Sequence, residues 1–263
     1  MKKAYKVLCA ILGLALILFF VFAQSDKLSE SIGLKKGKFN ETLFATVKEP
    51  AAKSVKTDSV ENEKKPGKAE MDTTAKTILF IGDSMVECLF PRMSAYAKKN
   101  GHKFYAVIWY SATTEIYGTR TTLKEYIDKF KPNYILFSLG GNELFIRDIK
   151  ENRQKYVDEI IRQMGDIPYI WIGPPNWKDD TGINEMIESS VPEGCYYKSY
   201  TPDQHYDRKK DGAHPNAPSS MLWMDRIAKW IMTKSAHRIR LDAPPAGEKG
   251  RPDELELLQP VSR

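Results

Sequence analysis

The chain has 263 residues, which is enough for one sizeable domain with terminal extensions. Its formal net charge of +6 is spread over the whole length, and no stripe of Lys and Arg residues marks a nucleic-acid surface, so we expect no nucleic-acid partner. The four histidines and three cysteines have no metal-ligand spacing, so the sequence predicts no metal site.

The N-terminus is basic and then apolar. Three lysines within the first six residues precede a continuous apolar run of 17 residues, 7–23. This arrangement is typical of an export signal or a membrane anchor, and 17 residues is near the shortest helix that crosses a bilayer. Val21, Phe22 and Ala23 resemble a small-residue cleavage site, so cleavage and retention both stay open. We predict that residues 1–24 are a signal peptide or an N-terminal membrane anchor, with anchoring by 7–23 favoured. The rest of the chain would then be periplasmic or otherwise extracytoplasmic.

Composition divides the remaining sequence into three parts. Residues 25–75 are polar, contain two prolines and lack apolar periodicity, which predicts a flexible linker. Residues 76–236 contain the periodic segments and are the predicted folded domain. Residues 237–263 are polar and rich in proline, which predicts a disordered tail.

Apolar runs and amphipathic segments alternate along the predicted domain. Strands are expected at 77–81, 104–110, 134–139 and 168–172, and helices at 85–100, 122–130, 153–164 and 219–233. This alternation predicts an α/β fold of three layers, in which helices cover both faces of a central parallel sheet. Sites in such folds lie at the carboxyl ends of the strands. The loops of interest therefore start at Gly82, Ser111, Gly140 and Gly173.

A serine stands at the first of these loops. Gly82, Asp83 and Ser84 follow the first strand and open the first helix. Backbone N–H groups at a helix N-terminus favour a developing negative charge, as a nucleophilic serine requires. A serine at this position is also an ordinary N-cap, so the motif alone leaves both interpretations open.

Asp211 and His214 form a second candidate pair. If the segment forms a helical turn, a spacing of three residues places both side chains on the same side of it. Asp211 would then hold one tautomer of the imidazole, and the other ring nitrogen of His214 would take a proton from a serine. The alternative is a surface loop, because Pro215 and Asn216 are turn residues.

A third candidate, Asn142, follows Gly140 and Gly141 at the end of the third strand. An asparagine amide at a strand terminus is suited to stabilise an oxyanion, and removing one such donor costs about 3 kcal/mol of the barrier. A Gly-Asn pair is also common in plain turns.

Together, Gly82-Asp83-Ser84, Gly140-Gly141-Asn142 and Asp211-x-x-His214 resemble the SGNH (GDSL-type) hydrolase superfamily. The resemblance extends over 77–233. It implies a flavodoxin-like three-layer fold with Ser84 as nucleophile, His214 as base and Asp211 as its orienting partner. It also implies an oxyanion hole built from the Ser84 N–H, the Asn142 side chain and a glycine N–H.

The sequence departs from the family pattern at two places. Glu143 follows Asn142 where the family usually has aspartate, and this acid is expected to support the loop rather than the reaction. The block that supplies the glycine N–H is altered, which leaves Thr113 and Gly118 as alternative donors. An altered block is also similar to SGNH-like domains that acetylate surface polysaccharides.

Several aromatic residues lie in or beside the predicted loops. Trp177 and Tyr117 are the candidates for substrate binding, since aromatic rings near a serine suit sugars, although both residue types also pack loops. Trp171 is expected to pack in the core. Cys88 and Cys195 are expected either to pair or to remain free.

These residues predict a serine esterase that acts through an acyl-serine intermediate and needs no cofactor. By resemblance, the expected activity is that of an O-acetylesterase acting on acylated cell-envelope carbohydrate or another ester. One alternative is an O-acetyltransferase of a surface polysaccharide, working with a membrane acyl-transporting partner. A non-catalytic glycan-binding protein is the other, and it would be expected to lack a member of the triad.

Overall fold

The computed structural model describes residues 70–261. The predicted N-terminal segment, 1–24, and all but the last six residues of the predicted linker, 25–75, lie outside the described residues. Between residues 70 and 261, no helix has the length and apolar character needed to cross a membrane.

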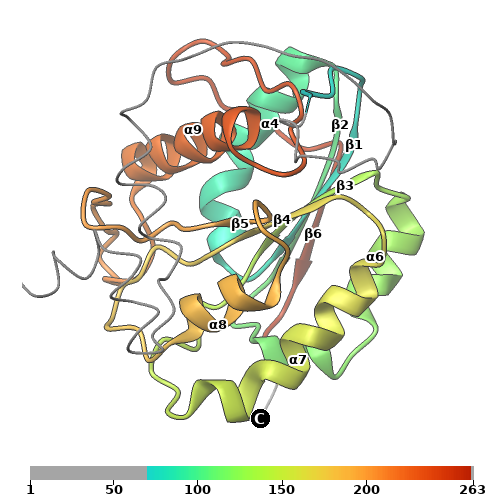
Figure 1. Cartoon of the computed structure of the whole chain (residues 1–263). Coiled ribbons are helices and arrows are strands. Elements are labelled where there is room, and N and C mark those ends of the chain that lie inside the picture. The colour runs from blue at the N-terminus through green and yellow to red at the C-terminus, as the bar shows by residue number, and fades with distance from the viewer. Residues whose placement is uncertain (1–69, 262–263) are drawn as a thin grey trace, which may run out of the picture. The chain divides into compact units, whose positions relative to one another are not determined.

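A six-stranded parallel sheet forms the centre of the fold (Figure 1). Its order is β5-β4-β3-β1-β2-β6. The strands are β1 (Thr77–Gly82), β2 (Lys103–Trp109), β3 (Tyr134–Ser138), β4 (Tyr169–Ile172), β5 (Tyr196–Tyr197) and β6 (Glu254–Leu258). The inner order, 2-1-3-4-5, is that of flavodoxin-like sheets. The predicted α/β fold with a central parallel sheet is confirmed.

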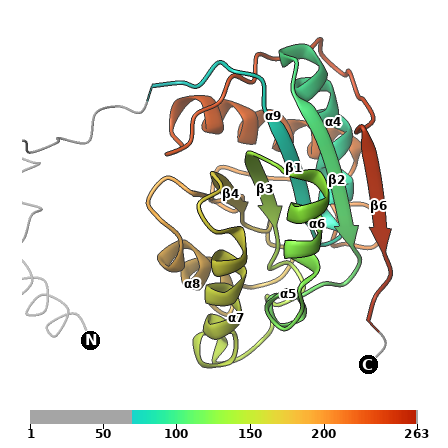
Figure 2. The same cartoon turned by 90° about the vertical axis from the view of Figure 1, so that its right-hand side faces the viewer.

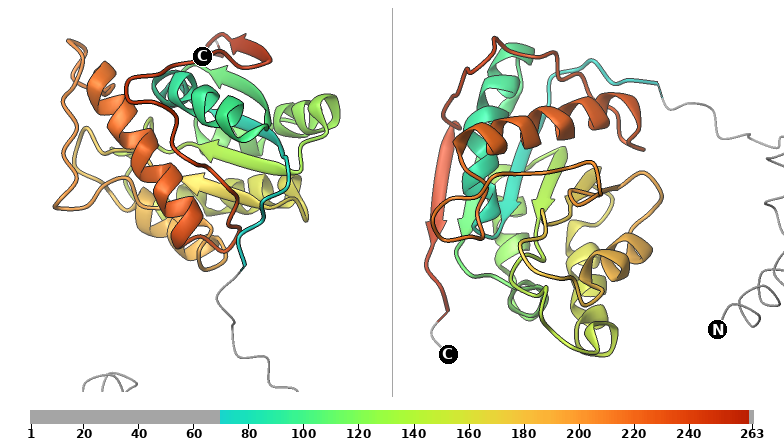
Figure 3. Two further views of the ribbon diagram at one scale, coloured as in Figure 1. Left: turned by 90° about the horizontal axis from the view of Figure 1, so that it is seen from above. Right: turned by 90° about the vertical axis from the view of Figure 1, so that its left-hand side faces the viewer.

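Helices cover both faces of this sheet (Figures 1 and 3). One face carries α4 (Met85–Asn100) and α9 (Ala217–Thr233). The other carries α5 (Thr114–Gly118), α6 (Thr122–Phe130), α7 (Ile149–Met164) and α8 (Ile183–Ser190). The helices α5 and α8 were not predicted from the sequence.

The first strand, β1, is buried on both faces of the sheet, which explains its continuous apolar run. Ile78 and Phe80 point into the core beneath α4 and α9, whereas Leu79 and Ile81 point into the core on the opposite face. Successive side chains of a strand alternate between faces, so a strand buried on both sides needs apolar residues throughout. All four are fully buried.

The prediction that residues 237–263 form a disordered tail is wrong for 237–261, the part that the structure describes. Within it, β6 pairs in parallel with β2 and forms an edge of the sheet (Figure 2). The buried Arg92 of α4 donates hydrogen bonds to the carbonyls of Pro245 and Glu248, at 2.8 and 3.0 Å. His102 is also buried, and its Nε2 lies 2.8 Å from the Arg240 carbonyl oxygen. The folded domain therefore extends beyond residue 236.

The two cysteines of the described chain are buried and free. Cys88 belongs to the core beneath α4 and α9, and Cys195 belongs to the core on the opposite face. The sheet therefore separates them, which excludes the disulfide alternative. Burial raises the pKa of the Cys195 thiol to about 11 and also raises that of Cys88.

Candidate active site

The turn after β1 lies at the point where the strand order reverses, between β1 and β3, which is where ligands bind in flavodoxin-like sheets. This turn is held tightly against β3. A Cβ on Gly82 would lie 1.9 Å from the Ser138 carbonyl oxygen, so no other residue fits there without displacing β3. The next residue, Asp83, donates its N–H to the same oxygen at 3.0 Å.

Ser84 begins α4 without capping it. Its side chain makes no capping hydrogen bond. Instead, the Asp83 carboxylate accepts the Met85 N–H at 2.9 Å and takes over the role that an N-cap would have. The Ser84 Oγ lies 2.8 Å from His214 Nε2. Among residues 70–261, the Ser84 N–H has no hydrogen-bond acceptor, so it is available to a ligand.

Asp211 and His214 are joined as the sequence predicted, although in a tight turn rather than a helical one. His214 Nδ1 lies 2.9 Å from Asp211 Oδ2, while Asp211 Oδ1 accepts the backbone N–H groups of Ala213 and His214 at 2.8 and 2.9 Å. These backbone bonds, followed by the imidazole, lower the pKa of Asp211 to about 2. The ionised carboxylate favours the tautomer with its proton on Nδ1, which leaves Nε2 as an acceptor for the serine proton.

The turn that carries His214 is fixed from outside. The Arg208 guanidinium donates to the carbonyl oxygens of Ala213, Pro175 and Asn176 at 2.8, 2.7 and 2.9 Å. The turn is thereby tied to the loop that follows β4. Nothing in the short motif Asp-x-x-His signals this arginine.

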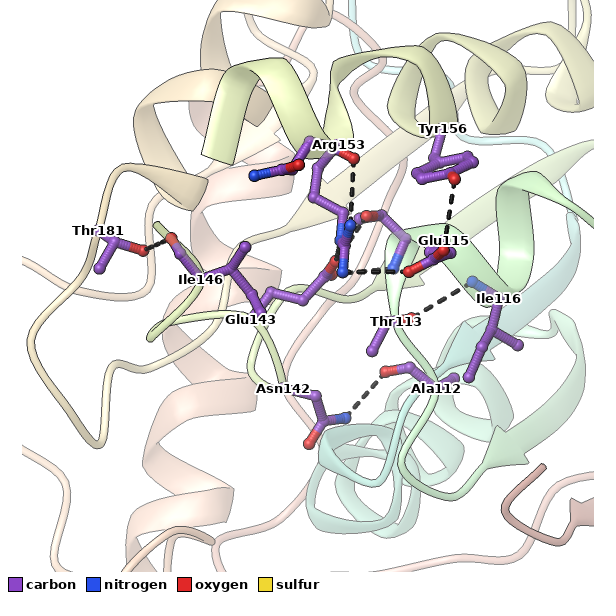
Figure 4. A network of polar contacts seen from close by, with 12 residues as sticks. Ala112, Thr113, Glu115, Ile116, Asn142, Glu143, Ile146, Arg153, Tyr156 and Thr181 are labelled. Atoms are coloured by element: carbon purple, nitrogen blue, oxygen red, sulfur yellow. Dashed lines mark hydrogen bonds and ion pairs between the residues drawn. The ribbon is translucent and has the colours of Figure 1, made fainter. Parts of the chain in front are cut away.

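The loop after β3 carries Asn142 toward the loop after β2. Asn142 Nδ2 donates to the Ala112 carbonyl oxygen at 2.8 Å (Figure 4). An amide nitrogen has two hydrogens, so one remains for another acceptor. The Trp177 indole N–H donates to the Gly141 carbonyl oxygen at 2.9 Å. Trp177, a candidate for substrate binding, is half-buried, and this hydrogen bond holds the loop of Asn142 in place.

The two alternatives for the remaining donor have different surroundings. Thr113 follows Ala112 directly and caps α5, with its Oγ1 accepting the Ile116 N–H. Its own N–H has no acceptor within the described part of the chain. Gly118 lies at the end of α5 and packs against α7, where a Cβ would lie 2.6 Å from Tyr156 Cβ. Thr113 therefore remains the candidate for the third oxyanion donor. The alternative, Gly118, is wrong, because this glycine allows α5 and α7 to pack closely.

Glu143 joins the loops after β2 and β3 (Figure 4). Its carboxylate is fully buried and accepts the Thr114 N–H at 2.9 Å, the Thr114 hydroxyl at 2.7 Å and Arg153 Nε at 2.8 Å. Arg153 also lies 3.1 Å from the exposed Glu115 carboxylate. Burial raises the pKa of Glu143 despite these donors. The contacts agree with the supporting role predicted for this acid.

Asp83 is the second buried carboxylate beside Ser84. Burial raises its pKa to about 7, and the charge of Glu143 adds to the rise. The Met85 and Gly141 N–H groups act in the opposite direction. Asp83 thus lies between the turn of Ser84 and the loop of Asn142, with its carboxyl group close to Gly141, a position that the sequence did not reveal.

The candidate role of Tyr117 in substrate binding is wrong. Its side chain is fully buried, and its ring packs edge-on against the rings of Trp109 and Phe137. Its hydroxyl donates to the Gly82 carbonyl oxygen at 3.2 Å. Tyr117 therefore supports the turn of Ser84 from below. Trp171 is fully buried, as predicted.

Residues 70–261 contain no cluster of His, Cys, Asp and Glu side chains that could hold a metal ion. The groups assembled at the carboxyl edge of the sheet are instead a hydrogen-bonded serine, histidine and carboxylate, and backbone N–H groups without acceptors. This is a set suited to acid–base and nucleophilic chemistry.

No protein-family model matches the chain, and no curated protein does. Among solved structures, the chain is similar to the psychrotrophic esterase EstA from Pseudoalteromonas sp., with 15% identity and a TM-score of 0.41 over 59% of this chain and 96% of that one. It is also similar to a lipase/acylhydrolase from Enterococcus faecalis, with 17% identity and a TM-score of 0.45 over 59% and 95%. A third similar structure is the salicylyl-acyltransferase SsfX3 from a tetracycline biosynthetic pathway, with 15% identity and a TM-score of 0.40. The match covers 61% of this chain and 55% of SsfX3.

Proposed function

We propose that the protein is a serine-dependent acyl-ester hydrolase that works through an acyl-serine intermediate on Ser84. One observation supports this most strongly. The Ser84 Oγ, the His214 ring and the Asp211 carboxylate form a continuous hydrogen-bonded line, with contacts of 2.8 and 2.9 Å. Asp211 and His214 lie 127 and 130 positions after Ser84 in the sequence, so only the fold brings them close to it. The Ser84 side chain also makes no capping hydrogen bond, although it lies at the N-cap position.

The first half of the reaction forms the acyl-enzyme. His214 Nε2 takes the Ser84 hydroxyl proton as Oγ attacks the ester carbonyl carbon, and Asp211 stabilises the resulting imidazolium. The proton then passes from Nε2 to the leaving alkoxide as the C–O bond breaks. The Ser84 N–H, the Thr113 N–H and the Asn142 amide are the donors available to the oxyanion, and each such donor contributes about 3–4 kcal/mol.

The second half releases the acid. His214 takes a proton from water, which attacks the acyl carbon, and the same Nε2 returns a proton to the Ser84 oxygen as it leaves. An alcohol in place of water would make the protein an acyltransferase with the same groups. The acylated cell-envelope carbohydrate, the extracytoplasmic location and the membrane acyl-transporting partner stay predictions from the sequence.

Labelling with a fluorophosphonate and turnover of p-nitrophenyl acetate would test the proposal on the full-length protein. We expect labelling and turnover in the wild type, and loss of both in Ser84→Ala and His214→Ala. Ser189→Ala is a matched control, because this serine lies in α8 and its hydroxyl only donates to the Met186 carbonyl oxygen. A well-folded wild type that neither labels nor turns over ester would favour the non-catalytic glycan-binding alternative.

A further inference from the structure

A cavity of about 580 Å³ lies beside Asn142. Its walls come from the loops after β2 and β3, from α5, from α7 through Arg153, and from the segment after β6. The volume lies within the roughly 300–1,000 Å³ of small-molecule sites. We infer that this cavity binds the acyl part of the ester, and that it takes neutral acyl groups longer than acetyl. The inference rests on the proposed function of Ser84.

The chemistry of acyl transfer indicates which part of the substrate enters. The leaving oxygen must receive its proton from His214 Nε2, and the attacking water or alcohol must give its proton to the same atom. Both groups therefore approach on the side of His214. The cavity is lined by Asn142 and Thr113, which also supply proposed oxyanion donors, whereas Ser84, His214 and Asp211 lie outside its lining. Of the substituents on the tetrahedral carbon, the acyl chain is the one left to extend into it.

The lining of the cavity favours an uncharged, largely apolar group. Ile116, Phe145 and Ile146 contribute apolar side chains, and Pro260 and Val261 contribute more. Phe145 is 53% exposed, so its ring is accessible to a group that enters the cavity.

The charged groups in the cavity wall are paired with one another and leave a negative net charge. The positive charge of Arg153 is shared between the carboxylates of Glu143 and Glu115, at 2.8 and 3.1 Å, so one positive and two negative charges leave a net charge of −1. An acyl group that ends in a carboxylate would meet this excess, because Arg153 is the one cation among the described residues that line the cavity. The same charges are compatible with a neutral chain.

The C-terminal wall is held by hydrogen bonds that its backbone carbonyls accept from the end of β2. The Leu258 carbonyl oxygen accepts the Tyr110 N–H at 3.0 Å, and the Gln259 carbonyl oxygen accepts the Trp109 indole N–H at 3.0 Å. These bonds place Pro260 and Val261 at the cavity. The segment that the sequence assigned to a disordered tail thus contributes to the proposed acyl site.

A series of p-nitrophenyl esters from acetate to octanoate would test the inference, because the leaving group stays constant. Burial of a methylene contributes about 0.8 kcal/mol, or roughly 4-fold in kcat/KM. We expect kcat/KM of the full-length wild type to rise by about that factor per methylene from acetate to butyrate and further to hexanoate. The hemisuccinate ester should be at least about 10-fold poorer than the butyrate, because of the negative excess at Arg153.

Two variants fill the cavity from different elements. Ile146→Trp and Val261→Trp should each lower the ratio of kcat/KM for hexanoate to kcat/KM for acetate toward about 1, the value for an enzyme without chain-length selectivity. Leu222→Trp is the control, because Leu222 is an exposed residue of α9 outside the cavity, and it should keep the wild-type ratio. Two filling variants guard against one that fails to fold, and a thermal melt of each identifies such a case.

The outcomes separate the two proposals. Ser84-dependent turnover with a flat chain-length profile in the wild type, or with a profile unchanged in both folded filling variants, overturns the acyl cavity and leaves the proposed function standing. Turnover or labelling that does not depend on Ser84 overturns both. If water is a poor acceptor, the mass of the acyl-serine adduct formed with each ester gives the same comparison.

Discussion

Replacing Glu143 with alanine removes the carboxylate that joins the two loops beside the proposed oxyanion site. The carboxylate is fully buried and accepts three hydrogen bonds, two from Thr114 and one from Arg153. After the change, the Thr114 N–H and hydroxyl lose their acceptor. Arg153, whose side chain is only 16% exposed, keeps a single carboxylate partner near the surface.

Breaking a buried ion pair by removing one partner costs about 3–5 kcal/mol, since an uncompensated charge remains. For a domain of this size, 1 kcal/mol corresponds to roughly 2–4 °C in Tm, so we expect Tm to fall by about 6–20 °C. Glu143→Gln keeps one carbonyl acceptor and should lose about 1.5–3 kcal/mol, the range for a hydrogen bond to a charged group. Urea denaturation gives the free energies of unfolding, and p-nitrophenyl acetate turnover below Tm gives kcat.

Glu115→Ala is the matched control, because it removes the other carboxylate of the same arginine. Glu115 is 48% exposed, so its loss should cost less than about 1 kcal/mol. The expected order of stability is therefore wild type, Glu115→Ala, Glu143→Gln and Glu143→Ala. If Glu143→Ala is no less stable than Glu115→Ala and turns over ester at the wild-type rate, the linking role assigned to Glu143 is wrong.

Three further changes test the site and its support. Asp211→Asn should lower kcat about 10³–10⁴-fold without loss of the fold, because the ionised acceptor of the Nδ1 proton is removed, and a similar kcat would contradict the assigned role. Gly82→Ala should cost more than about 3 kcal/mol or prevent folding, since its Cβ would lie 1.9 Å from the Ser138 carbonyl oxygen; urea denaturation measures this. Asp83 has its folded-state pKa raised from 3.8 to about 7, so the native state holds the proton to higher pH than the unfolded chain. Its contribution to stability is therefore full below about pH 4 and decreases by an amount on the order of 4 kcal/mol as pH rises to 7. Urea denaturation at both pH values should show this decrease in the wild type and not in Asp83→Asn. Equal pH dependence in the two proteins would refute the raised pKa.

The central part of the fold could be predicted because its signals are local. The segment from 78 to 81 is apolar throughout and is followed by Gly82, and the helix after it has apolar residues at helical spacing. The structure places β1 at Thr77–Gly82 and α4 at Met85–Asn100, within a residue of the prediction. The triad could be predicted for the same reason, since its motifs follow directly from such strands or precede the last helix.

The C-terminal segment could not be predicted because distant residues hold it. Among residues 70–261, β6 is an edge strand that pairs with β2 on one side, and two of its leucines, Leu255 and Leu257, are exposed, so burial leaves little pattern in its sequence. The coil before it is bound through backbone carbonyls by Arg92, about 150 positions earlier. A polar, proline-rich composition looks the same whether such an arginine is present or not. The strand β5 was missed for a simpler reason, because two residues form no periodic pattern.

The site itself depends on buried carboxylates in a way that no single motif shows. Asp83 accepts the Met85 N–H and lies against Gly141, and Glu143 accepts N–H groups of Thr114 and Arg153. The loops after β1, β2 and β3, which carry the three proposed oxyanion donors, are thus joined through two carboxyl groups that are buried away from water. A shift of the loop after β2 relative to the loop after β3 would leave the Glu143 carboxylate with fewer donors, at a cost of about 1–3 kcal/mol for each lost partner. Donors that are held in this way need little reorganisation when negative charge develops on the substrate, and that is the condition under which an oxyanion hole contributes most to the rate.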